Sequence, residues 1–540
     1  MCEVLKSNFE TLFPLIENAI KQCEFVALDT EFTGLQFDES CKASLFDTSE
    51  GRYLKLRRSF TQFTICQIGL SAFVNIKDNK YEAHTFNLYL FPHAFGPSDV
   101  RFMIQASSIS FLTKHNFDFN KFVYEGVPYL NMEEELKLKE HISRKTMFSG
   151  LEREVDEEEI QCICSEIAEW FVRSKKHEIY KVENNSDTNK TNAYLLHTEI
   201  RTRFPDVWTH TDEADNIIVE HVTSSRRSEL EDLDLDTRKQ EEQKLVQAML
   251  GFTRVFRLLQ DYQKPIVGHN MLSDLMLVFD KFYKPLPEKF CDFKKELNTV
   301  LPRIYDTKHI TFSAKKGLAD HVVLDKTSLR KIYQILNSKE ASEAVLFSPC
   351  IEHAAKFDLY KDVELPHEAG YDAFMCGSVF LKLAHILSRK EIQSIDINPC
   401  GFNSYVSHLH PFLNCVNIIR ATVNHVRLDG EDPESLRPEI LFVKSKKKGF
   451  KLSSEQLAKW FSPYGKVDVK LQGNNRGLVA TGNHGCAKDI LKSFRRHGRI
   501  YVRKYNVWKH SPIVTILLWT GAITSAAVCI GVLISSFKTS

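Results

Sequence analysis

The sequence has almost no excess of charge of either sign. Its 540 residues include 71 Lys and Arg against 70 Asp and Glu, which gives a formal net charge of +1. A chain with this balance has no overall field that would attract nucleic acid, so a surface that binds nucleic acid would have to be local. With 43% hydrophobic and 26% charged residues, the composition excludes a disordered chain and indicates a globular protein with more than one domain.

Two other features are missing from the sequence. The amino terminus, MCEVLKSNFETLF, lacks a basic segment followed by an apolar one, so we expect no secretory signal. The 13 cysteines are scattered, and only Cys162 and Cys164 are close, in a C-x-C spacing. We interpret the cysteines as free thiols in a reducing compartment, with a metal site at this pair as the less favoured alternative.

Short apolar runs predict a mixed sheet in the first third of the chain. The run at 24–28 (EFVAL) leads directly to Asp29 and Glu31. An apolar run before an acidic cluster is typical of a buried strand that delivers side chains at its end. The runs at 63–73 and 83–91 also have strand composition.

The pattern of strands and helices is then interrupted by polar and charged sequence. Between charged connectors at 152–159 and 228–244 lie predicted helices at 160–171 and 193–204, a polar stretch at 183–191 and a predicted strand at 216–222. A strand at 265–268 and a helix at about 368–388 resume the first pattern. We therefore predict a split α/β domain at 1–150 and 245–390, interrupted by a small α+β domain at 155–228.

The charge balance changes towards the carboxyl terminus. Residues 437–509 contain 18 Lys and Arg against 4 Asp and Glu. The predicted order of strand, helix, strand, strand, helix, strand indicates an RNA-recognition-motif-like (RRM-like) α+β domain at 410–508. Stacking aromatics are mostly absent, since Phe442 is the one found on the first strand and the third offers Arg476, Leu478 and Ala480. Phosphate binding through charge and a purely packing role are both open.

Charged residues are absent from 513–534 (IVTILLWTGAITSAAVCIGVLI). Such a segment is long enough to cross a bilayer of about 30 Å as a helix. We predict one C-terminal transmembrane helix that anchors the protein to the cytosolic face of an intracellular membrane. Its moderate hydrophobicity and basic flanks favour the mitochondrial outer membrane over the endoplasmic reticulum. A buried core helix is the alternative.

Four acidic residues stand out by their context. Asp29 and Glu31 are two apart at a strand end, so both carboxylates point to the same side. Asp274 follows Gly-His-Asn-Met-Leu-Ser at the start of a predicted helix, and Asp372 lies five residues after His367. Each element alone is a weak signal, but the order D-x-E, G-H-N-x-x-x-D, H-x-x-x-x-D is specific.

Four carboxylates in one cleft fit two-metal hydrolysis of a phosphodiester. They can hold two Mg²⁺ about 3.5–4 Å apart, whereas without cations they would repel one another and raise their own pKa values. Oxygen ligands suit Mg²⁺ or Mn²⁺ and not zinc. A histidine near the attacking water can act as general base, and His367 is the candidate.

At these motifs the chain resembles the poly(A)-specific ribonuclease family of DEDDh exonucleases, which implies a ribonuclease-H-like core. The similarity covers about residues 8–386 and is densest around FVALDTEFTGL, KPIVGHNMLSDLMLVFDKFYKPLP and HEAGYDAFMCGS. It places the metal ligands at Asp29, Glu31, Asp274 and Asp372 and the catalytic histidine at His367. The predicted C-terminal helix favours the membrane-anchored branch of the family, whose members trim the 3′ ends of PIWI-interacting RNAs (piRNAs).

The resemblance implies a function. We expect a 3′→5′ exoribonuclease that uses two Mg²⁺, trims precursor piRNAs and releases nucleoside 5′-monophosphates. The implied partners are single-stranded RNA held by a PIWI protein and a membrane-bound Tudor-domain adaptor, and a homodimer is left open. One alternative is a poly(A) deadenylase, which would use the same residues. Another is a membrane-anchored RNA-binding scaffold without catalysis, against which the intact carboxylate set counts.

The motifs and the resemblance also bear on whether several further residues have a functional role. The insert occupies the place of the family's Arg-xxx-His nucleic-acid domain, and Arg173 and His177 have that spacing. Because they lie at the end of a predicted helix, we interpret this match as chance. Asp306 invites a role as a fifth ligand, but capping of the following turn is favoured. Phe32 and Thr33 are candidates for contact with the terminal nucleotide, with a core role for Phe32 as the alternative.

Overall fold

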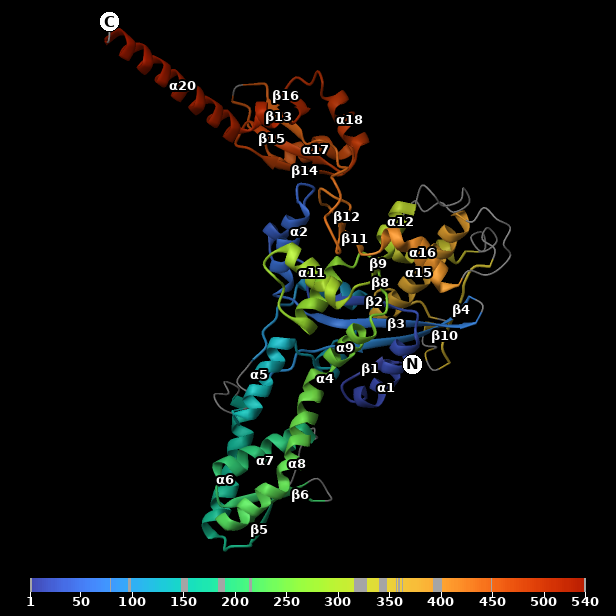
Figure 1. The fold of residues 1–540 in the computed structure, drawn as a ribbon, viewed down its shortest axis with the longest axis vertical. Helices are drawn as coiled ribbons and strands as arrows, with labels where there is room; N and C mark the ends of the chain where they lie inside the picture. The colour runs from blue at the N-terminus through green and yellow to red at the C-terminus, as the bar shows by residue number, and fades with distance from the viewer. Residues whose placement is uncertain are drawn as a thin grey trace. The chain divides into compact units, whose positions relative to one another are not determined.

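The computed structural model describes residues 2–77, 79–95, 99–146, 154–182, 190–212, 216–314, 328–338, 347–355, 357, 360–361, 363–391, 401–447 and 449–538. Within these residues the chain forms two compact units, which can be followed by colour in Figure 1. The larger unit takes up most of the chain before residue 418. The smaller unit contains residues 42–55 and most of the chain from residue 418 onward.

The larger unit is built on a mixed sheet whose strands, among the described residues, follow the order β1-β4-β3-β2-β8-β9, with β10 paired to β4. Strand β3 is antiparallel to both β2 and β4, and the other pairs are parallel. The predicted strands are confirmed as β2, β3, β4 and β8. Figure 1 shows β2 and β8 side by side, although more than half of the unit's sequence separates them. The bounds are β1 Glu3–Val4, β2 Phe25–Phe32, β3 Ile65–Lys77, β4 Lys80–Tyr89, β8 Ile266–Gly268, β9 Ile304–Asp306 and β10 Cys350–His353.

One long helix covers one face of this sheet. Helix α15 (Ala369–Glu391) confirms the predicted helix at 368–388 and packs on β2, β3, β4 and β8. Phe25 of β2 lies with its ring centroid 5.0 Å from that of Phe380 in α15. Fully burying such a side chain stabilises the fold by about 1.5–3 kcal/mol. Because side chains alternate along a strand, every second residue of β2 points at α15.

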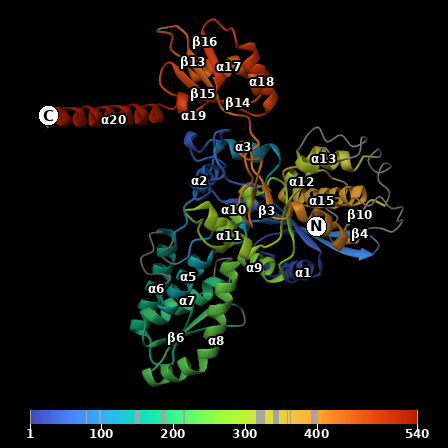
Figure 2. The same cartoon turned by 45° about the horizontal axis from the view of Figure 1, so that its top comes forward.

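Other helices surround the sheet. Helices α12 and α13 lie beside α15, as Figure 2 shows, and α1 packs against α9 and β3. Cys415–Asn417 (β11) and His425–Arg427 (β12) form a separate two-stranded sheet. The remaining bounds are α1 Phe9–Gln22, α2 Ser49–Phe60, α3 Ala106–Lys114, α4 Phe119–Glu125, α5 Met132–Ser143, α9 Phe252–Tyr262, α10 Leu272–Val278, α11 Phe290–Val300, α12 Thr307–Ala314, α13 Leu329–Leu336 and α16 Phe402–Leu409.

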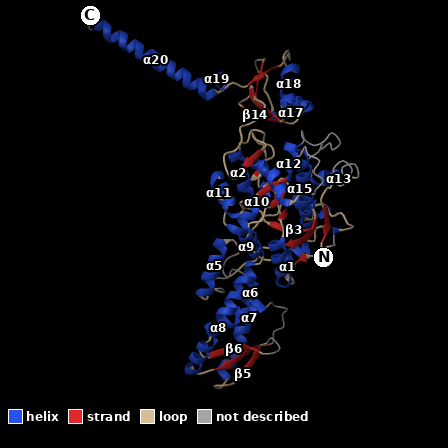
Figure 3. Cartoon of the chain, turned by 45° about the vertical axis from the view of Figure 1, so that its right-hand side comes forward, coloured by secondary structure: helices blue, strands red, loops and turns tan. Residues whose placement is uncertain are grey.

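The segment that interrupts the sheet has its own small core. Its three strands pair antiparallel in the order β5-β7-β6 and stand next to helices, as Figure 3 shows by colour. Ile167, Ile200 and Val219 are fully buried in its centre. Strand β7 was predicted from the sequence, whereas β5 and β6 were not. Of the polar stretch predicted at 183–191, residues 183–189 lie outside the described residues and the last two begin α7. The bounds are α6 Glu154–Arg173, β5 Ile179–Val182, α7 Lys190–Arg203, β6 Val207–Thr211, β7 Ile217–His221 and α8 Ser224–Leu250.

Both predicted connectors were wrong where the structure describes them. Helix α6 already begins at Glu154, and the charged stretch 228–244 is the middle of the 27-residue helix α8. Oppositely charged residues three or four apart stabilise a helix, and α8 has such pairs at Arg227–Glu231 and Arg238–Glu242. Helix α8 ends at Gly251, whose φ is 37° and where a side chain would meet the Pro128 carbonyl.

The smaller unit contains the six elements predicted for 437–509, in the predicted order. Their strands form an antiparallel sheet, β14-β15-β13-β16. Leu441 and Val443 of β13 and Val479 of β15 point to the helices and build the core. The bounds are β13 Leu441–Ser445, α17 Ser454–Phe461, β14 Val467–Leu471, β15 Arg476–Thr481, α18 His484–Ser493 and β16 Ile500–Lys504.

The other face of this sheet carries cations and two aromatic rings. Lys444 pairs across the strands with Arg476 on one side and Tyr501 on the other. The Arg503 guanidinium lies 4.4 Å from the Tyr501 ring centroid. Phe442, the aromatic residue expected on this face, is buried under the stacked ring of His510, with centroids 4.3 Å apart. Tyr501, which the sequence analysis did not consider, is the more accessible ring.

The chain continues into two further helices. His510 belongs to the short helix α19 (Val507–His510), and α20 spans Pro512–Lys538. Among the residues that the structure describes, no helix combines the length and the apolar character needed to cross a membrane.

Candidate active site

Strand β2 directs two carboxylates at helix α15. Phe25 and Ala27 are buried against α15, and Asp29 and Glu31 continue the same alternation towards the end of the strand. Sequence spacing alone placed these two acids on one side of the strand. The structure shows that this side is the one covered by the helix that carries Asp372.

The first turn of α15 approaches β3 unusually closely. Gly69 pairs with Asp29 across the strands, and a β-carbon at Gly69 would lie only 1.9 Å from the Ala369 carbonyl oxygen. Two buried amides of the sheet replace a normal helix cap. The Ala369 N–H donates to Gln67 Oε1 at 3.0 Å, and the Gly370 N–H donates to Asn87 Oδ1 at 3.1 Å. These contacts hold Asp372, in the first turn of α15, against the strand pair that carries Asp29.

A third carboxylate comes from the turn after β8. Asn270, with φ of 64°, and Met271 donate their backbone N–H groups to the Asp306 carboxylate at 2.9 and 3.2 Å. This turn starts helix α10, whose first turn contains the buried Asp274. Thr30 Oγ1 donates to Asp274 Oδ1 at 2.5 Å, which joins α10 to β2 between the two strand acids.

Burial and mutual repulsion shift the pKa values of the four carboxylates. Burial, followed by repulsion from Asp372 and Asp274, raises the pKa of both Asp29 and Glu31 well above their usual range. Burial also raises the pKa of Asp274 to about 6 and that of Asp372 to about 7. These carboxyls therefore hold protons more tightly than isolated acids do, and divalent cations can take the place of those protons.

His367 lies at the entrance to α15. It precedes the helix with φ of 68°, and its backbone N–H donates to Asp372 Oδ1 at 3.4 Å. Ligand atoms of His367, Glu31 and Asp372 all lie within 4.8 Å of one another. Partial burial, then the neighbouring His115 and Arg330, lower the pKa of His367. Its imidazole is therefore neutral near pH 7 and able to accept a proton.

The donor set fits magnesium. Its charged members are carboxylate oxygens from two strand positions and two helix starts, and hard oxygen donors of this kind hold Mg²⁺ or Mn²⁺. A single neutral imidazole at the edge does not make the site one for zinc, which prefers several nitrogen or sulfur ligands.

Comparison with known proteins identifies the family of this chain. The model of the CAF1 family of ribonucleases matches residues 4–380. The chain belongs to the CAF1 family of ribonucleases. It is 35% identical to the poly(A)-specific ribonuclease PNLDC1 of Mus musculus over 97% of each chain, and 31% identical to the pre-piRNA 3′-exonuclease trimmer of Bombyx mori over 99% of each. It is 29% identical to the poly(A)-specific ribonuclease PARN of Homo sapiens over 88% of this chain and 76% of that one.

The structure shows the surroundings of Asp306, which the sequence offered as a possible fifth ligand. Asp306 is fully buried, and its carboxylate also accepts from the backbone N–H groups of Lys308 and His309. It therefore caps α12 and fixes the turn before α10, as the sequence favoured. Asn417 donates to the same carboxylate at 2.9 Å.

The two residues after Glu31 differ in exposure. Phe32 is half-buried, with its ring 6.2 Å from Phe60, so it retains some accessible surface. Thr33 is 1% exposed, and its hydroxyl accepts from the Thr64 N–H at 3.0 Å. The predicted contact of Thr33 with a nucleotide is not supported, because its side chain is occupied inside the fold.

Two further pairs of residues from the sequence analysis lie in or beside the inserted segment. Arg173 is the last residue of α6 and His177 lies in the following turn, where its N–H donates to the His221 carbonyl. Cys162 is exposed on α6 and Cys164 is buried, and both are free thiols.

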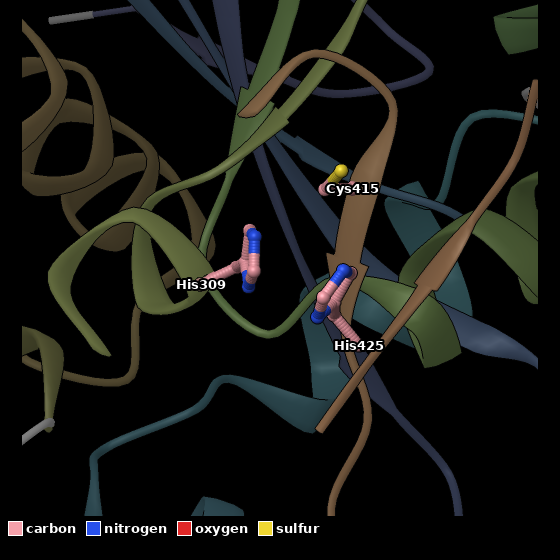
Figure 4. A group of neighbouring side chains, drawn as sticks. All are labelled: His309, Cys415 and His425. Atoms are coloured by element: carbon pink, nitrogen blue, oxygen red, sulfur yellow. The ribbon is translucent and has the colours of Figure 1, made fainter. Parts of the chain in front are cut away.

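A second group of potential metal ligands was not anticipated. His309, Cys415 and His425 offer ligand atoms within 4.8 Å of one another (Figure 4). Nothing in the sequence signals this group, because its members are scattered over more than a hundred positions. Three ligands are one fewer than a closed structural zinc site has.

The structure also adds residues that the sequence analysis missed. Gln67 and Asn87 sit on strands and bind the start of α15, and His115 lies against His367. Gln67 carries one usable signal, since it stands opposite Glu31 in the sheet. For the other two, only the tertiary contact reveals a role.

Proposed function

We propose that this ribonuclease is a 3′→5′ exoribonuclease that trims the 3′ ends of precursor piRNAs. The observation that carries the proposal is that Asp372 and Asp274 lie close enough to Asp29 and Glu31 to raise their pKa values. Ligand atoms of His367, Glu31 and Asp372 lie within 4.8 Å of one another. Similarity to the Bombyx mori trimmer over 99% of both chains supports the choice of substrate.

The four carboxylates would hold two Mg²⁺. When bound, such ions activate water and stabilise a leaving oxygen. The chain itself supplies the rest. His367, neutral at physiological pH, accepts the proton of the attacking water. Gln67, Asn87 and Gly69 keep the start of α15 on the sheet, so that Asp372 stays close to Asp29.

The decisive experiment uses the purified full-length chain and 5′-labelled single-stranded RNA. With Mg²⁺ we expect a ladder of 3′-shortened products and release of nucleoside 5′-monophosphates. A 2′-O-methyl group on the last ribose should slow the reaction, because the active site must close around that sugar. Internal cleavage of a circular RNA, or equal rates with Mg²⁺ and with chelator, would contradict the proposal.

A second candidate is a poly(A) deadenylase, which the names of the mouse and human relatives favour. The same residues would catalyse both reactions. Matched RNAs that end in oligo(A) or in mixed sequence distinguish them: a trimmer shortens both at similar rates, and a deadenylase prefers the first and pauses at the junction.

Although the described part of α20 does not have the length and apolar character of a membrane-spanning helix, we also propose that segment 513–534 attaches the protein to the cytosolic face of an intracellular membrane, with the mitochondrial outer membrane favoured. Over 513–534 the sequence has no charged residue. Ile516, Leu517, Trp519 and Ile523 are each more than 60% exposed, and apolar surface of this extent is normally covered by lipid or by a partner. Retention in carbonate-washed membranes would support the anchor, and recovery in the soluble fraction would exclude it.

Tethering would matter because it raises the local concentration of enzyme near its substrate. A PIWI-bound precursor RNA and a membrane-bound Tudor-domain adaptor remain predicted partners, and a homodimer remains open. Affinity purification from germline membranes with the full-length chain tests these partners directly.

A further inference from the structure

Helix α3 ends against the candidate general base. The His115 ring centroid lies 4.2 Å from that of His367, with the rings tilted by 56°. Phe111, one helical turn earlier, meets His367 edge-on at 4.8 Å and His115 at 4.7 Å. The three rings form a cluster in which each touches the other two.

The other end of α3 is fastened to the strand that carries Glu31. The Gln105 N–H donates to the Thr33 carbonyl at 2.8 Å, and the Gln105 side-chain oxygen accepts from the Leu35 N–H at 2.9 Å. Thr33 is two residues beyond Glu31. Helix α3 is thus held at its start by the residues that follow β2, and its last turn reaches His367.

His367 needs such support more than the carboxylates do. Asp274 and Asp372 lie in first helical turns that restrict their rotamers, whereas His367 precedes α15 and is exposed. An exposed imidazole on a turn samples several rotamers, and each one outside the productive geometry lowers the fraction of active enzyme.

We infer that His115 is a positioning residue for this reaction, which uses its ring to hold the His367 imidazole in the orientation needed at the cleft. The inference rests on the proposed role of His367. The contact is one of ring faces and edges, so shape and not hydrogen bonding should carry the effect.

The inference predicts a specific pattern of rates. Immobilising one side chain corresponds to about a two- to tenfold change in an equilibrium. His115→Ala should therefore lower the single-turnover rate by about two- to tenfold, with KM for RNA unchanged. His115→Phe, which keeps an aromatic ring, should restore most of the rate. Lys114→Ala, at the neighbouring exposed position of α3, is the matched control and should behave as wild type.

A double-mutant cycle with His367→Ala provides the decisive test. With enzyme in excess over 5′-labelled RNA, His115→Ala should have no further effect in the His367→Ala background. A full additional loss there would mean that His115 contacts the substrate, and the positioning role would be wrong. Equal rates for His115→Ala and wild type, or equally slow Ala and Phe variants, would also overturn it. Thermal unfolding of each variant shows whether a lower rate results from loss of the folded state. If His115→Ala is unfolded, the rate of His115→Phe relative to wild type tests the positioning role.

The cycle separates this inference from the proposed function. If His367→Ala itself keeps the wild-type rate, the assignment of the general base fails, whatever His115 does. If His367→Ala is slow and His115→Ala is not, only the positioning inference fails.

Discussion

The largest sheet of the larger unit and the four-stranded sheet of the smaller unit differ in where they place charge. In the larger unit, Asp29 and Glu31 lie on the sheet face that α15 covers, together with Asp274 and Asp372. In the smaller unit, Lys444 and Arg503 lie exposed on the face opposite the helices. One sheet gathers charges of one sign at half-buried positions and at the buried Asp274, and the other spreads them where water screens them.

This difference determines how strongly each group of charged residues indicates a function. Buried like charges destabilise a fold unless cations neutralise them, so their presence is a strong indication of a metal-dependent site. Exposed cations cost little and are consistent either with RNA binding or with a merely solvated face. The carboxylate group therefore identifies the chemistry, whereas the basic face only suggests where RNA continues.

The largest effect is expected from the carboxylates. Asp29→Asn, Glu31→Gln, Asp274→Asn or Asp372→Asn should each reduce cleavage of RNA below detection, because each removes a ligand charge while keeping the side-chain volume. Asp261→Asn, at an exposed position of α9, should cleave normally. Wild-type rates in any two of the four variants, under excess Mg²⁺, would show that the buried group is not the catalytic one.

Substitution of His367, at the edge of the same site, should lower the cleavage rate less than loss of a carboxylate. His367→Ala should slow the chemical step by about 10²–10⁴-fold, as expected on loss of a general base. Single-turnover rates at saturating enzyme measure this step. A variant with altered RNA affinity and an unchanged rate would instead assign His367 to substrate binding.

The dependence of folding stability on pH should also distinguish the two sheets. The folded pKa values of about 6 for Asp274 and about 7 for Asp372 exceed the ordinary value of 3.8. The folded protein then binds more protons than the unfolded one above about pH 4. In chelator, stability should be greatest below that pH and should fall as pH rises through 6 and 7.

Thermal unfolding at pH 5 and pH 8, with EDTA or with Mg²⁺, measures this effect. Mg²⁺ should abolish most of the decline, and Asp372→Asn should reduce it in EDTA. A melting temperature that is independent of pH and of Mg²⁺ would mean that the carboxylates do not destabilise the metal-free fold.

A smaller effect is expected on the basic face. If Lys444, Arg476 and Arg503 contact phosphates, each change to alanine should weaken binding of single-stranded RNA about fivefold at 0.1 M salt and lower the salt slope by about 0.7. Lys488→Ala, on helix α18, removes an equal charge from elsewhere on the unit and is the control. Equal losses for all four variants would assign the effect to overall charge and not to the sheet face.

The smallest effect in solution should come from removal of α20. Truncation after Ser511 should leave the rate on free RNA unchanged, because neither sheet depends on that helix. In cells the same truncation should impair trimming if tethering is needed. A truncated enzyme that trims normally in cells would separate the proposed anchor from function.

Much of this protein follows from its sequence alone. The apolar run ending in Asp29 and Glu31 predicted β2, and the ordered acidic motifs predicted which four carboxylates form the candidate site. The six elements of 437–509 were also predicted in order. Each of these features depends on residues close in sequence, where periodicity of two or 3.6 residues reports which side chains share a face.

Tertiary structure decided the rest, because it depends on contacts between distant residues. Gln67 accepts a hydrogen bond from the Ala369 N–H, although the two residues are 302 positions apart in the sequence. No local sequence pattern predicts that the side-chain amide of a strand residue will cap this helix. Two ring contacts also join residues that are distant in the sequence. His510 stacks on Phe442, and His115 contacts His367. Local periodicity therefore determined which residues carry the chemistry, whereas packing across the sheet decided what holds them in place.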